Sequence, residues 1–142
     1  MKVKDLMTPD ARFIPAGSSL REAAKEMKKL DCGFLPIGHA DGEKLQGVVT
    51  DRDIVLRGVA NGLDPDAATV EEVKSDKVLY CFKDDDVDPA SRSMQQNQVY
   101  RLVVLDNKED KRMCGIISLG DVIRGGEKEI ASKTASVVTE AA

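Results

Sequence analysis

The spacing of apolar residues along the chain changes between a helical and a strand period in a fixed order. From Leu20 to Leu30 apolar side chains recur every three or four positions, which predicts an amphipathic helix. Ser19 precedes this helix and Glu22 follows three residues later, a capping-box signature that sets its start. A short apolar run at Phe13–Pro15 predicts a strand before the helix.

Two more strands and a second helix are predicted after this first helix. The strands occupy Phe34–Ile37 and Leu45–Thr50, and a turn signal at Asp41–Gly42 joins them into a hairpin. The second helix is expected to begin directly after the hairpin, at Asp51 or Asp53. The first part of the chain therefore has the order β-α-β-β-α.

The same order occurs a second time. When Val3 is placed on Val70, the apolar positions of the two halves coincide: Phe13 meets Tyr80, Leu20 meets Val87, Met27 meets Met94 and Leu35 meets Leu102. One extra residue in a later loop of the second copy then brings Gly47 onto Gly115 and Asp53 onto Asp121. The second copy predicts a helix from Val87, strands at Arg101–Leu105 and Met113–Ser118, and a helix beginning at Asp121.

The repeat sets the expected organisation of domains. We expect a first repeat at 1–62, a linker at 63–69, a second repeat at 70–126 and a tail at 127–142 that is either a docked helix or a frayed end. Each copy is about 55 residues long, too short to bury much of its own surface, so the copies are expected to share a core. The predicted fold class is α+β, with two β-α-β-β-α units packed through their sheets.

Composition narrows the function classes. The 142 residues include 21 Lys and Arg against 25 Asp and Glu, a net charge of −4, and only 4% are aromatic. Such a chain disfavours nucleic acid, because it repels the phosphate backbone and offers few rings for stacking. The apolar stretches are too short to cross a membrane, and the polar start has no signal-peptide pattern, so we expect a cytoplasmic protein.

Catalytic signatures are missing from the sequence. The single histidine, His39, lies in a turn signal, and the three cysteines Cys32, Cys81 and Cys114 are far apart in apolar surroundings typical of buried thiols. The run 84–86 of three aspartates is interpreted as a solvated helix cap rather than a metal site. We therefore expect no enzyme, no metal and no catalytic cofactor.

The sharpest local pattern occurs once in each copy. A buried strand ends in a hydroxyl residue and an aspartate follows three positions later, as Thr50 with Asp53 and as Ser118 with Asp121. One interpretation is helix capping, for which Thr, Ser and Asp are preferred. The other is a nucleotide site, since a carboxylate accepts hydrogen bonds from a ribose diol and a helix start with a hydroxyl favours phosphate. The pattern alone leaves both open.

These features together resemble the cystathionine-β-synthase (CBS) domain, present here as a tandem pair over residues 3–124. The resemblance is carried by the repeated Gly-h-h-Thr/Ser-x-x-Asp pattern (h, apolar), by Leu35–Pro36, by Met7–Thr8–Pro9, and by the run 50–55, which is similar to stand-alone bacterial members. It implies a module that binds AMP, ADP or ATP, or NAD or S-adenosylmethionine, in clefts between the repeats. It also implies a homodimer.

Site residues follow from the resemblance by position. Asp53 and Asp121 are expected to hold ribose hydroxyls, Thr50 and Ser118 to meet phosphate or ribose, and Arg52 to neutralise phosphate. The groups expected around adenine are Ile14, Pro15, Leu35, Pro36, Ile37, Cys81, Phe82, Leu102, Val103 and Val104.

The second copy departs from the family pattern in three places. It has Lys74–Ser75–Asp76 in place of Met–Thr–Pro, Val103 in place of proline, and no basic group at Leu119–Gly120. Its site is therefore expected to bind more weakly than the one built on Thr50, Arg52 and Asp53.

Two functions remain after these steps. One is a sensor in which nucleotide occupancy alters a dimer or a partner protein. The other is a dimerisation scaffold whose aspartates only cap helices. In both cases apolar helix faces around Met27, Ile54 and Val122 are expected to serve a homodimer.

Overall fold

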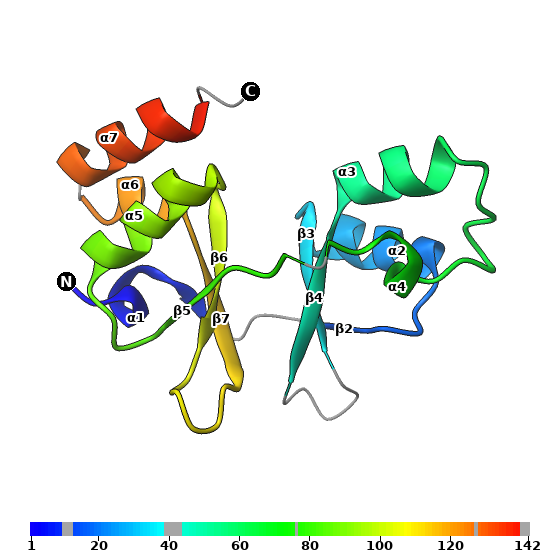
Figure 1. The fold of residues 1–142 in the computed structure, drawn as a ribbon, viewed down its shortest axis with the longest axis horizontal. Helices are drawn as coiled ribbons and strands as arrows, with labels where there is room; N and C mark the ends of the chain where they lie inside the picture. Colours follow the sequence, from blue (N-terminus) through cyan, green and yellow to red (C-terminus); the bar gives the residue numbers. More distant parts are fainter. Residues whose placement is uncertain (10–12, 39–43, 76, 127, 140–142) are drawn as a thin grey trace. The chain divides into compact units, whose positions relative to one another are not determined.

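The computed structural model describes residues 1–9, 13–38, 44–75, 77–126 and 128–139. The chain divides into two compact units (Figure 1). The unit that contains Arg12–Val78 is called the N-repeat unit. The unit that contains Met1–Ala11 and Leu79–Ala142 is called the C-repeat unit.

The N-repeat unit has a three-stranded sheet of order β2-β3-β4, in which β2 runs parallel and β4 antiparallel to β3. Its elements are β2 (Ile14–Pro15), α2 (Leu20–Leu30), β3 (Phe34–Gly38), β4 (Leu45–Thr50), α3 (Asp51–Asp53), the π-helix η1 (Ile54–Val59) and α4 (Val70–Val73). Leu20, Ala23 and Met27 of α2 pack on Leu35 and Ile37 of the sheet. This apolar layer is the core of the unit.

The C-repeat unit has a four-stranded sheet of order β1-β7-β6-β5. Its elements are α1 (Val3–Leu6), β1 (Thr8–Pro9), β5 (Tyr80–Phe82), α5 (Val87–Asn97), β6 (Arg101–Leu105), β7 (Met113–Ser118), α6 (Leu119–Arg124) and α7 (Lys128–Thr139). Met94 of α5 packs on Leu102, Val104 and Ile117 of the sheet. Strands β5 to β7 repeat the parallel and antiparallel pairing of β2 to β4.

The two repeats exchange their leading segments. Helix α4 belongs to the second repeat by sequence, but Val70 and Val73 are fully buried in the N-repeat core, and the Ser75 N–H donates to the Val48 carbonyl (2.9 Å). Conversely Val3 of α1 is fully buried in the C-repeat core, and Thr8 of β1 pairs with β7. Each compact unit is therefore completed by a segment from the other repeat.

Most predicted elements are confirmed, but α6 begins at Leu119, two residues before the predicted Asp121, because Ser118 is its N-cap. Helix α2 begins after the Ser19–Glu22 capping box as expected, and β4, β6 and β7 have the predicted ranges. The predicted turn at Asp41–Gly42 lies outside the described residues. The α+β fold class is confirmed, with two sheets and a repeated strand and helix order.

Two helices hold details that the sequence left open. The second helix of the first repeat begins at Asp51 but continues as a π-helix, in which the Ala60 N–H donates to the Val55 carbonyl (2.9 Å). The tail forms α7, which lies beside α5 and α6 (Figure 1). Val138 is buried, and Gln95 donates to the buried Thr134 hydroxyl (3.0 Å), so the described tail is a docked helix. No helix within the described residues has the length and apolarity needed to cross a membrane.

Candidate functional site

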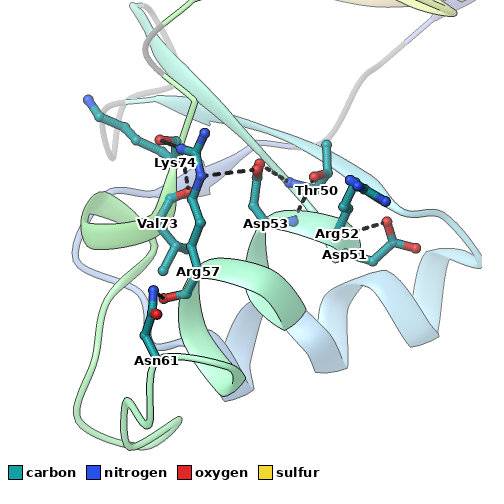
Figure 2. Close-up of polar contacts among 8 residues, drawn as sticks. All are labelled: Thr50, Asp51, Arg52, Asp53, Arg57, Asn61, Val73 and Lys74. Carbon is teal, nitrogen blue, oxygen red and sulfur yellow. Dashed lines mark hydrogen bonds and ion pairs between the residues drawn. The ribbon is translucent and has the colours of Figure 1, made fainter. Parts of the chain in front are cut away.

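Thr50 and Asp53 form a reciprocal pair at the end of β4. The Asp53 N–H donates to Thr50 Oγ1 (3.0 Å), and the Thr50 N–H donates to Asp53 Oδ2 (3.0 Å) (Figure 2). This is a capping box, so the capping role weighed from the sequence is present. It uses one oxygen of the carboxylate and leaves Oδ1 for another partner.

Arg57 lies beside the second oxygen of Asp53. Arg57 Nε lies 4.0 Å from Asp53 Oδ1, and Arg57 Nη1 donates to the carbonyls of Lys74 (3.0 Å) and Val73 (3.4 Å) (Figure 2). Arg52 is exposed, and its side chain has no hydrogen-bond or ion-pair partner among the described residues. One cation, Arg57, therefore lies beside a carboxylate that is 15% exposed. The sequence identified Arg52 but not Arg57, which contacts Asp53 from the next helical turn.

The exchange of segments moves Lys74 and Ser75 into the N-repeat unit. Lys74 Nζ donates to the Gln46 carbonyl (3.3 Å) and pairs with Glu71 (3.0 Å), and its chain passes over Gly47. The sequence attributed the residues at 74–76 to a weaker site in the second copy. The structure corrects this for the described Lys74 and Ser75, because they contact β4 of the first copy.

Ser118 and Asp121 repeat the same pair in the C-repeat unit. The Asp121 N–H donates to Ser118 Oγ (3.1 Å), and the Ser118 N–H donates to Asp121 Oδ2 (2.9 Å). Here the other oxygen is taken, because Arg124 Nη2 bonds directly to Asp121 Oδ1. Asp121 is also buried, with 7% of its side chain exposed.

Leu119–Gly120 carries no basic group, as the sequence shows, but Arg124 brings one to Asp121 from further along the chain. A Cβ atom on Gly120 would lie 3.1 Å from Arg124 Nη1, so the guanidinium occupies the space that a side chain at 120 would use. The glycine thus makes room for a cation supplied from one turn further along α6. The two copies therefore differ in one contact: Arg124 bonds directly to Asp121, whereas Arg57 lies 4.0 Å from Asp53.

The apolar residues expected around adenine divide by sheet face. Ile14, Leu35 and Ile37 point into the N-repeat core, and Cys81, Leu102 and Val104 into the C-repeat core. Pro36 and Val103 are buried but, by strand alternation, lie on the opposite faces of their sheets. Pro15 is exposed and Phe82 half-buried. Val103 has no exposed surface and Pro36 is also buried, so among these residues only Pro15 and part of Phe82 are open to solvent.

The cysteines of the C-repeat unit are poor nucleophiles. Burial raises the pKa of the Cys81 thiol to about 12 and also raises the pKa of Cys114. Among the described residues, no group of three or more His, Cys, Asp or Glu is placed to hold a metal ion. His39 lies outside the described residues.

The aspartates at 84–86 bind the N-terminal segment. Lys4 Nζ pairs with Asp84 (2.9 Å), Lys2 Nζ pairs with Asp86 (2.9 Å), and Asp85 accepts a hydrogen bond from the Phe82 N–H (2.9 Å). Beside them is an open pocket of about 280 Å³; it is lined by Phe82, Asp84, Asp85, Asp106, Asn107, Lys108 and Glu109. The pocket includes neither Ser118 nor Asp121.

Comparison with known proteins agrees with the repeat. The family model described as the CBS domain matches residues 3–59 and again 70–127. YlbB of Bacillus subtilis (strain 168) is 37% identical over 121 residues, which span 85% of this chain and 79% of YlbB. Hypoxic response protein 1 of Mycobacterium tuberculosis is 34% identical over 121 residues, spanning 85% of this chain and 82% of that protein.

Solved structures share the fold. The crystal structure of Hypoxic Response Protein I with two coordinated zinc ions superposes with a TM-score of 0.78 at 32% identity, covering 87% of this chain and 98% of that one. The domain pair of protein MJ0100, in complex with 5′-methylthioadenosine and S-adenosyl-L-methionine, gives a TM-score of 0.72 at 30% identity, covering 89% and 98%.

Proposed function

Because the chain belongs to the CBS-domain family, we propose that it is a regulatory module that binds an adenosine-containing nucleotide at Thr50 and Asp53. Asp53 carries this proposal: its Oδ2 is fixed by the Thr50 N–H, while its Oδ1 has only the more distant Arg57. A carboxylate fixed in this way accepts hydrogen bonds from a ribose diol without first having to be ordered. The adenosine ligands of the MJ0100 pair support the ligand class.

The phosphate of such a ligand would contact the side chains of Arg52 and Arg57. Arg52 is exposed, and the Arg57 side chain is 56% exposed beside Asp53. A guanidinium offers planar, permanently charged donors that match phosphate geometry. We propose AMP, ADP or ATP as the ligand, with NAD and S-adenosylmethionine as alternatives that share the adenosine group.

The proposed role is binding rather than catalysis. The thiols of Cys81 and Cys114 are held in the protonated form by their raised pKa, which removes their nucleophilic character. The regulatory output then passes through a homodimer or through a partner protein.

A nucleotide titration tests the proposal. AMP, ADP, ATP, NAD and S-adenosylmethionine are each added to the full chain in a thermal-shift panel, and the responders are measured by calorimetry. A ligand present at 100 times its Kd stabilises the folded chain by about 2.7 kcal/mol. Asp53→Ala should remove most of the shift and leave only the part due to the weaker second site. A panel with no shift and no heat for any of the five would overturn the proposal.

Two observations favour the alternative, a scaffold that binds no nucleotide. Both aspartates complete capping boxes and need no ligand for that role, and the π-helix η1 exposes the apolar side chains of Val55, Leu56 and Val59. A scaffold would form a dimer that no adenosine compound stabilises. The same panel, followed by light scattering, separates the two functions.

A further inference from the structure

Arg57 joins two parts of the N-repeat unit that are separate in sequence. Its guanidinium lies 4.0 Å from Asp53 on one side and donates to the Val73 and Lys74 carbonyls on the other (Figure 2). Its own carbonyl accepts a hydrogen bond from Asn61 Nδ2 (3.0 Å), which fixes the backbone of η1 at that point. One side chain thus contacts both the candidate nucleotide site and the end of α4.

The segment that Arg57 holds is the route out of the unit. After α4, the Lys74 N–H donates to the Val70 carbonyl (2.9 Å) and the Ser75 N–H to the Val48 carbonyl (2.9 Å). The N-repeat unit ends a few residues later at Val78, and the C-repeat unit resumes at Leu79. Residues 73–75 therefore lie near the end of the N-repeat unit, shortly before the chain enters the C-repeat unit.

The C-repeat unit provides an internal comparison. Gly125 stands at the place of Arg57, and Leu6 of α1 packs so closely on it that a Cβ atom there would clash. Arg124 bonds to Asp121, and within the described residues it has no hydrogen bond to α1 or β1. The leading segment of that unit is held by apolar packing, by backbone hydrogen bonds and by ion pairs of Lys2 and Lys4 with Asp86 and Asp84. Among the described residues, a bridge from aspartate through arginine to the leading segment is therefore found in the N-repeat unit and not in the C-repeat unit.

We propose that Arg57 is a positioning residue that couples nucleotide binding at Asp53 to the segment at residues 73–75; this inference rests on the function proposed above. When the ribose hydroxyls bind Asp53, the 5′-phosphate comes within reach of Arg57 and draws its guanidinium away from the Val73 and Lys74 carbonyls. The end of α4 then loses the cation that caps it. Residues 73–75 then open more often.

Native-state hydrogen exchange of the full chain tests the coupling at the Lys74 and Ser75 amides. In the wild type, saturating AMP should speed their exchange about tenfold, the effect of losing a charge-assisted hydrogen bond on local opening. Adenosine, which has the diol but no phosphate, should leave their exchange unchanged. Binding of both compounds is measured separately by calorimetry.

Variants separate the coupling from simple stability. Arg57→Met should give fast exchange at these amides with or without AMP, and Arg57→Lys, which restores a positive charge, should recover slow exchange in the free protein. Arg92→Met is the matched control, because Arg92 makes an exposed i,i+4 pair with Asp88 (3.9 Å) in the C-repeat unit. It should leave the AMP response intact.

The outcomes distinguish the two proposals. If calorimetry detects no AMP binding, the proposed function fails. If AMP binds but the Lys74 and Ser75 amides do not respond in the wild type, or respond equally in Arg57→Met, then nucleotide binding stands and the coupling through Arg57 is overturned.

Discussion

Leu6 occupies the space that a Cβ atom on Gly125 would need, and the two residues lie at opposite ends of the C-repeat unit's sequence. The contact places α1, from the start of the chain, against the end of α6. Glycine is needed here for close approach rather than for an unusual backbone conformation, since Gly125 has φ −74°.

Gly125→Ala should therefore destabilise the protein. Overpacking against Leu6 is expected to lower the free energy of unfolding by about 1–3 kcal/mol, measured by urea denaturation. Gly17→Ala is the control, because nothing lies within 4 Å of its added Cβ. Equal stability of the two variants would mean that Leu6 moves aside without cost.

The exchange of leading segments between the repeats predicts that Val3 stabilises the C-repeat core rather than the N-repeat core. Val3→Ala removes a fully buried side chain from the C-repeat core and should cost about 2 kcal/mol, whereas Val55→Ala changes a side chain that is 54% exposed and should cost little. Hydrogen exchange should show the loss of protection in β6 and β7. Loss of protection in β3 and β4 instead would contradict the assignment of Val3 to the C-repeat core.

Local signals explain why so much of the fold could be predicted. Helix α2 has its capping box and apolar spacing within a few neighbouring residues, and β6 and β7 end where apolar runs meet polar residues. The pair of Thr50 with Asp53 is equally local, because its hydrogen bonds span three residues.

The exchange of leading segments between the repeats and the contacts of Arg57 and Arg124 could not be predicted in the same way. Val3 and Val70 have matching surroundings in sequence, so either could complete either core, and the choice depends on long-range packing. Arg57 and Arg124 reach their aspartates from the following helical turn, by four residues in one copy and three in the other. Aligning the copies position by position therefore missed both.

The N-terminal ion pairs predict a loss of stability in acid. Hydrogen bonds from the ammonium groups of Lys4 and Lys2 hold the pKa of Asp84 and of Asp86 below their usual values. Carboxyl groups with a lowered pKa in the folded state stabilise it above the pKa of the unfolded chain, near 4, and lose that effect as pH falls through the folded pKa.

Thermal melts should therefore change little through these pairs from about pH 7 to 5 and decline below about pH 4. Lys2→Gln and Lys4→Gln together should reduce the acid-dependent part of the decline, and added salt should do the same because the pairs are exposed. An unchanged acid profile in the double variant would show that these pairs contribute nothing to folding.

The exposed face of η1 predicts a homodimer, and it lies next to Ile54, one of the three residues around which the sequence placed the interface. Met27 and Val122 are buried within their own units and Ile54 is half-buried. The exposed apolar side chains of η1 are those of Val55, Leu56 and Val59, and Ile123 of α6 is also exposed.

Light scattering behind a sizing column should give the mass of a dimer at micromolar concentration. Val55→Asp with Val59→Asp should give a monomer that keeps the wild-type circular dichroism spectrum, because charge on an apolar interface opposes association. A wild-type monomer, with and without AMP, would exclude this interface.

The state of the two aspartates predicts unequal nucleotide sites. Asp121 has both oxygens occupied, by the Ser118 N–H and by Arg124, and its side chain is only 7% exposed. A ribose diol must displace Arg124 to bind there, whereas at Asp53 the Oδ1 atom has only Arg57 at 4.0 Å. Replacing a charge-assisted hydrogen bond costs about 1.5–3 kcal/mol, or one to two decades in affinity.

Calorimetry with AMP on the wild type should therefore show a tight event that is lost in Asp53→Ala and kept in Asp121→Ala. Arg124→Ala releases the Oδ1 atom of Asp121 and should strengthen the weaker binding event. Arg52→Ala should weaken ATP binding more than adenosine binding, because ATP carries phosphate for this cation and adenosine does not. Two equal events per chain in the wild type, or loss of the tight event in Asp121→Ala, would show that closure by Arg124 does not govern the second site.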